Sequence, residues 1–106
     1  MTDSANYNAL LTLAIPSALE DDVLNFLLQH PRWASGFSMV DAVGMGQGAS
    51  LVSAMEKVQG RARRTLVQIA GVDADLRELV GALGQEIRNR EVAWWIAPIS
   101  AFGRLQ

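Results

Sequence analysis

The sequence predicts a small α+β domain in which four strands and two helices follow one another along the chain. Apolar residues recur at every second position in four segments and at helical spacing in two others, and prolines and glycines separate most of these segments. The chain has 106 residues, of which 50% are apolar and 19% charged. This length and composition predict a single domain, spanning residues 1–106, with a buried core.

The first strand and the first helix are predicted from Tyr7 to Pro31. Residues alternate from Tyr7 to Ile15, and Pro16 ends the strand. The stretch Ser17–Glu20 fits a capping box, in which the serine caps the helix and the glutamate reaches back to it. The helix that follows ends before Pro31. Its apolar face consists of Leu19, Val23, Phe26, Leu27 and His30.

Two further strands are predicted over Gly36–Val43 and Arg61–Val72. A glycine segment, Val43–Gly48, follows the first of them. The stretch from Ala49 to Gln59 is ambiguous, because its apolar residues fit either a short amphipathic turn or a packed loop.

The second helix has the clearest helical stripe in the chain, and Asp73 or Asp75 is expected to cap it. Gly81 and Gly84 weaken this helix, or allow it to lie close to a sheet. A last strand is predicted over Glu91–Ala97, before Pro98. The helical stripe consists of Leu76, Leu79, Val80, Leu83 and Ile87.

The resulting order, β-α-β-β-α-β, is that of the ferredoxin-like fold, or split βαβ unit. It predicts a four-stranded antiparallel sheet with two helices on one face, which leaves the other face uncovered. The last strand nevertheless has a large apolar side chain on each face, since Trp94 and Trp95 are adjacent and alternate residues of a strand point to opposite faces. One tryptophan should therefore meet the helices and the other an interface. We expect a homo-oligomer whose sheets face one another.

Composition narrows the range of functions. The formal net charge is −2, which does not favour a nucleic-acid partner. There is no cysteine, so disulfides and thiolate metal sites are excluded. No basic leader or long apolar run is present, so we expect neither a signal peptide nor membrane insertion, and a cytoplasmic location.

Two groups of residues are candidates for binding a ligand. Backbone amides of Gly44, Gly46 and Gly48 could approach an anion, and the Gln47 side chain could add a contact, but these glycines could equally serve a loop. Arg61, Arg63 and Arg64 form the dense basic cluster; they suit phosphate or carboxylate, or else salt bridges at a strand edge. Arg61 and Arg63 should share one strand face, with Arg64 on the other.

No catalytic constellation emerges, so we do not expect an enzyme. His30 is the single histidine, and no motif pairs it with a serine and a carboxylate. Met39, Met45 and Met55 could indicate a soft-metal site, although methionine more often fills gaps in a core.

The words SGFSMVDAVGMG, VQGRARRTLVQI and VAWWIAPI resemble the PII-like superfamily, and a small bacterial family within it, from about residue 10 to 99. This resemblance implies a ferredoxin-like homotrimer that regulates rather than catalyses. Such proteins bind small molecules, adenine nucleotides among them, in clefts between subunits. They signal to a partner, here a membrane transporter or an enzyme, through a T-loop that would span about residues 44–59.

Two alternatives remain open at this point. CutA-type metal-tolerance proteins share the trimer, and a ligand-free interaction module would use the T-loop alone. The chain also departs from nucleotide-binding PII proteins, in which a basic glycine-rich loop follows the second helix. Here Gln85–Glu91 stands in that place and contains no glycine.

Overall fold

The computed structural model describes residues 6–45 and 61–106, and it confirms the predicted order of elements and the fold class. After β1 (Ala9–Pro16), a short 3₁₀ turn η2 (Ser17–Leu19) leads into α1 (Glu20–Leu28). The remaining elements are β2 (Ser38–Met45), β3 (Arg61–Gly71), α3 (Asp73–Glu86) and β4 (Ala93–Pro98).

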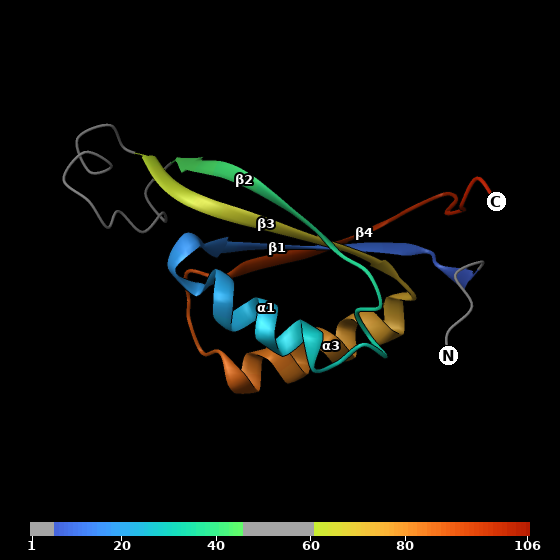
Figure 1. Ribbon diagram of the computed structural model, residues 1–106, viewed down its shortest axis with the longest axis horizontal. Helices are drawn as coiled ribbons and strands as arrows, with labels where there is room; N and C mark the ends of the chain where they lie inside the picture. Colours follow the sequence, from blue (N-terminus) through green and yellow to red (C-terminus); the bar gives the residue numbers. More distant parts are fainter. Residues whose placement is uncertain (1–5, 46–60) are drawn as a thin grey trace.

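The four strands form one antiparallel sheet in the order β2-β3-β1-β4. Both helices lie on the same side of this sheet, as Figure 1 shows. We call the opposite side the open face. The first and third strands occupy the centre and the second and fourth the edges, which is the ferredoxin-like arrangement.

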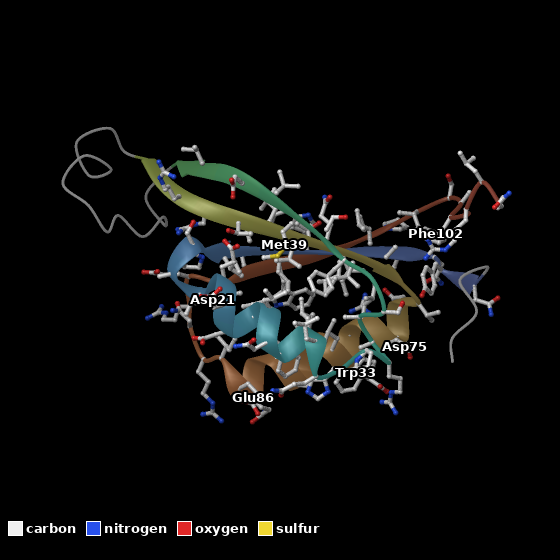
Figure 2. All side chains as sticks on the ribbon, in the orientation of Figure 1. Asp21, Trp33, Met39, Asp75, Glu86 and Phe102 are labelled. Atoms are coloured by element: carbon white, nitrogen blue, oxygen red, sulfur yellow. The ribbon has the colours of Figure 1, made fainter. Side chains whose placement is uncertain are left out.

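The core lies between the sheet and the helices. Leu11 and Leu13 of β1 pair with Ile69 and Val67 of β3, and all four side chains are buried. Met39 of β2 packs against this core from the edge (Figure 2). The predicted helical stripes are confirmed, since the helices bury Val23, Phe26, Leu27, Leu76, Leu79 and Leu83.

Both predicted helix caps are wrong, because partners distant in the sequence replace them. No side chain caps α1 at Leu19; the Glu20 carboxylate instead accepts a hydrogen bond from Thr65 Oγ1 at 2.9 Å. At α3, the backbone N–H of Asp73 donates to Asn8 Oδ1, also at 2.9 Å. Asp73 lies inside the first turn and accepts a hydrogen bond from Arg77 Nε, which raises the pKa of Arg77.

The close approach between a helix and the sheet involves a different glycine from those expected. Gly81 and Gly84 are exposed, and a Cβ added at either would meet no atom within 4 Å. At Gly71, by contrast, an added Cβ would lie 3.2 Å from Leu76 Cδ2. A side chain at the end of β3 would therefore crowd Leu76, the first buried residue of α3, which would have to shift by a few tenths of an ångström.

Replacing Gly71 with valine should lower the free energy of unfolding by about 1–3 kcal/mol, because overpacking forces Leu76 from its place. Gly81→Ala, in open space on α3, should raise it by about 0.5–1 kcal/mol through helix propensity. Urea denaturation of both variants measures these changes. A Gly71→Val protein as stable as the wild type would contradict the packing argument.

Candidate functional site

The second and third strands form an arm that extends beyond the first. The pairing of β1 with β3 ends at Pro16, which lies opposite Arg64. The pairing of β2 with β3 continues to Met45 and Arg61. Figure 1 shows β2 and β3 continuing past the end of β1. The predicted arginine cluster therefore lies at the root of the arm, where the sheet narrows from three strands to two.

The strand geometry separates arginines that are adjacent in the sequence. Arg63 lies opposite Val43, on the side of the sheet that carries the helices, and is exposed. Arg64 lies between Pro16 and Ala42, on the open face, and only 8% of its surface is exposed. The side chain of Arg61 is outside the described residues. Arg63 and Arg64 thus cannot bind one small ligand together, which agrees with the predicted alternation.

Arg64 is the unusual member of this group. Its Nη1 atom is buried and has no hydrogen-bond partner within the described residues. Within residues 6–45 and 61–106, Arg64 also forms no salt bridge. A buried guanidinium that lacks a counter-charge is unfavourable by several kcal/mol, so an anion beside Arg64 would offset that cost. Carboxylate, bicarbonate and phosphate all present oxygens that a guanidinium fork can bind.

The glycine segment begins where this arm ends. Gly44 belongs to β2 and lies opposite Ala62 of β3. Gly46, Gln47 and Gly48 lie outside the described residues, as does most of the T-loop predicted over residues 44–59. Whether these residues bind a ligand or act as a hinge remains a prediction. The structure adds that the start of the segment lies close to Arg64 across the β2–β3 pair.

The two tryptophans lie on opposite faces of the edge strand β4, as predicted. Trp94 pairs with Leu13 and faces the helix side, whereas Trp95 pairs with Thr12 and lies on the open face. Both stay about half exposed, at 47% and 48%. The helices therefore cover Trp94 only in part, because β4 is the outermost strand on this side of the sheet.

Neither histidine nor methionine forms a metal centre in the part of the chain that the structure describes. The His30 ring packs at a tilt against Phe26 and stacks on Trp33, at centroid distances of 4.4 and 5.3 Å. Met39 packs against the core, and the side chains of Met45 and Met55 lie outside the described residues. Over residues 6–45 and 61–106, no three His, Cys, Asp or Glu side chains gather as a metal site would need.

A hollow of about 240 Å³ lies on the helix layer, far from the open face. It lies between α1 and the end of α3, and its rim is acidic and polar. Sequence reasoning did not single it out, because its polar residues lie on the solvent faces of the helices, and Phe26 and Ile87 were assigned to the apolar stripes. The residues that line it are Asp22, Asn25, Phe26, Gln29, Glu86 and Ile87. Its charge is opposite to that which an anion requires, so Arg64 remains the candidate site.

Residues 5–106 match the family model described as "Protein of unknown function (DUF3240)". The chain belongs to the DUF3240 family. A DUF3240 protein from Shewanella baltica OS155 superimposes with a TM-score of 0.74 at 23% identity, over 94% of this chain and 98% of that one. No curated protein matches this DUF3240 chain.

Two PII-like proteins share the fold of this DUF3240 chain. The first is CPII, a nitrogen regulatory PII-like protein from Thiomonas intermedia K12, with a TM-score of 0.66 at 13% identity, over 92% of this chain and 93% of that one. A PII-like protein from Thermus thermophilus gives 0.57 at 16% identity, over 87% and 86%. The predicted resemblance to the PII-like superfamily is confirmed at the level of the fold. Neither described helix is long and apolar enough to cross a membrane.

The hydrogen bond between Thr65 and Glu20 anchors β3 next to Arg64, and a double-mutant cycle can measure it. Thr65→Val removes the donor from a charge-assisted hydrogen bond and should lower the free energy of unfolding by about 1.5–3 kcal/mol. With Glu20→Ala already present, the same change should have a much smaller effect. Asp22→Ala, an exposed acid of the same helix turn, serves as the control. Additive effects of the Thr65 and Glu20 changes would show that the contact does not matter.

Proposed function

We propose that this DUF3240 protein is a PII-like regulator, not an enzyme, that assembles as a homotrimer in the cytoplasm and binds a small anionic effector in clefts between its subunits. The observation that carries this proposal is Arg64, a buried guanidinium with an unpaired Nη1 on the open face of the sheet within the described residues. An effector that supplies the missing negative charge would bind there, at the root of the predicted T-loop.

The chemistry of the Thiomonas protein supports an anion of this kind. Its structure is described as bound to ADP, AMP and bicarbonate, all of which carry oxygens that a guanidinium recognises. In the present chain the residues around Arg64 on the open face are Pro16, Ala42 and Leu66, none of them charged. One buried positive charge among apolar neighbours favours a singly charged group, such as bicarbonate or a carboxylate, over a polyphosphate.

The segment after α3 also favours a small anion. Residues 85–91 read QEIRNRE, so two acidic and two basic side chains balance, and no glycine brings the backbone close to a phosphate chain. Glu91 N donates to Asn89 Oδ1 at 2.8 Å, so this turn satisfies part of its own backbone. Adenine nucleotides remain a class to test, with AMP expected to bind better than ATP.

Control of a partner would follow from the position of Arg64 on β3. The strand leads directly from Arg64 into the T-loop region, and β2 enters the same region after Gly44. An effector changes the loop only if it binds one loop state more tightly than another. We infer that the effector biases the T-loop toward or away from a conformation that docks on a regulated membrane transporter or enzyme.

Titration calorimetry with bicarbonate, AMP, ADP and ATP tests the effector proposal. Heat of binding should appear with at least one of these anions in the wild type and disappear in Arg64→Met, which keeps the length of the side chain but not its charge. Arg63→Met, exposed on the other side of the strand, is the matched control and should bind as the wild type does. Equal binding by all three proteins would exclude Arg64 as the site.

Stability without ligand gives an independent check on the state of Arg64. Because its charge is buried and Nη1 has no partner among the described residues, Arg64→Met should raise the free energy of unfolding by about 1 kcal/mol or more in an anion-free buffer. Adding the effector should stabilise the wild type and leave the variant unchanged. Thermal unfolding in both buffers measures this reversal. A variant less stable than the wild type in the anion-free buffer would argue that Arg64 is already paired.

Sedimentation velocity tests the homotrimer. The wild type should have three times the chain mass of 11.5 kDa. Trp95 is about half exposed on the open face. Trp95→Arg should yield monomers, because it would place like charges within the contact between subunits. Leu28→Arg changes another exposed apolar residue, on α1, and should leave the trimer intact. A wild-type monomer at micromolar concentration would refute the assembly.

A further inference from the structure

Beyond the Gly44–Ala62 pair at the end of the arm, the strand register sets four rows of side chains on the open face. One row contains Ala42, Arg64 and Pro16, and the next contains Val40, Leu66, Ala14 and Ala93. A third row, which we call the polar row, crosses all four strands. It consists of Ser38, Gln68, Thr12 and Trp95. The last contains Ala70, Leu10 and Ala97.

The polar row is therefore a single hydrophilic stripe between two apolar rows. Its central amide, Gln68, is half-buried and makes no side-chain hydrogen bond within the described residues. Ser38 beside it is exposed, while Thr12 on its other side is buried. Trp95 closes the row at the sheet edge and is about half exposed. In a face that is otherwise apolar, an unpaired amide requires a hydrogen-bonding partner once water is excluded.

The chemistry of this row selects the partner. An amide and a hydroxyl each donate and accept hydrogen bonds, so each can pair with its own copy, which a guanidinium or a carboxylate cannot do. The open face carries no charge in the described rows except Arg64, whose side chain is buried. The polar row and the two rows beside it are uncharged, and their self-complementary polar groups match a second copy of the same rows. A partner protein with an ordinary charged surface would leave charges without counter-ions against this face.

We propose that the polar row is the recognition element through which the open faces of different copies pair, with Gln68 as the residue that fixes their register. This inference rests on the proposed assembly and goes beyond it, because it assigns the specificity to one amide. Sliding one sheet by a single row would place Gln68 against the apolar Leu66 row of its neighbour and leave its amide unpaired. Only the aligned arrangement gives the amide its hydrogen-bond partners. A single buried polar residue fixes the register of coiled coils in the same way.

Four of the seven residues in the flanking rows are alanines, which favours the close contact that such pairing needs, and the other three are Val40, Leu66 and Leu10. Ala14 and Ala93 lie on one side of the polar row, and Ala70 and Ala97 lie on the other. Their short side chains bring the strands of two copies within reach of the Gln68 amide. Trp95, at the end of the row, supplies apolar area at the edge of the contact.

Two substitutions at Gln68 test the proposal, with mass measured by sedimentation velocity and native mass spectrometry over a range of micromolar concentrations. Gln68→Glu places like charges against one another and should raise the dissociation constant of the assembly at least about 100-fold. Gln68→Met keeps the size and removes the hydrogen bonds, and it should give assembled protein of mixed stoichiometry. Circular dichroism should show that both variants fold, since the residue lies outside the monomer core.

Gln85→Glu and Gln85→Met, at an exposed glutamine of α3, are the matched controls and should leave the mass unchanged. A wild type that forms one oligomer, with Gln68→Glu forming the same oligomer over the same concentrations, would overturn the role of Gln68 and leave the assembly standing. A folded Gln68→Met protein with one unchanged stoichiometry would also overturn it. A monomeric wild type would instead refute the assembly itself, and with it this inference.

Discussion

A four-stranded sheet that its own two helices cover on one face only is the constraint on which the rest of this structure depends. The alternation of side chains along a strand turns every residue of β1 and β3 toward either the helices or the open face. The helix side of these strands is closed by aliphatic residues such as Leu11 and Ile69. The open side is almost as apolar, which a strand facing water on one side does not require. This composition of the second face is the basis for the proposed contact between copies of the chain.

The same alternation decides which residues can act together. Arg63 and Arg64 are adjacent in the sequence, yet one is exposed beside Val43 and the other is buried beside Pro16. Consecutive arginines on a strand are thus divided between the two faces of the sheet and cannot bind one ligand together. Residues far apart in sequence converge instead, as Thr65 and Glu20 do across 45 positions. On this fold, the residues that can act together are those that lie side by side on neighbouring strands, not those that are consecutive in the sequence.

The order of elements, the buried stripes and the separation of Trp94 from Trp95 could all be predicted, because they follow from periodicity within one segment. Helix caps could not, because Asn8 reaches Asp73 from 65 positions away and replaces the local cap with a tertiary one. The glycine at the close contact between helix and sheet was also predicted wrongly. It is Gly71, and only the position of Leu76 in the fold distinguishes it, which no pattern within β3 reveals. For the candidate site, the face of Arg64 was predictable, but its burial was not, since burial depends on neighbours from several strands.

Arg64, the proposed anion site, and Gln68 of the polar row lie on the same face of β3, four residues apart, which corresponds to about 13 Å along an extended strand. Arg64 and Gln68 therefore point in the same direction, toward whatever covers the open face. If that cover is another copy of the chain, an anion on Arg64 lies beside the subunit contact. By thermodynamic linkage, an anion that binds the assembled form more tightly must stabilise the assembly by the same factor. The same uncovered sheet face would then take part both in subunit assembly and in effector binding.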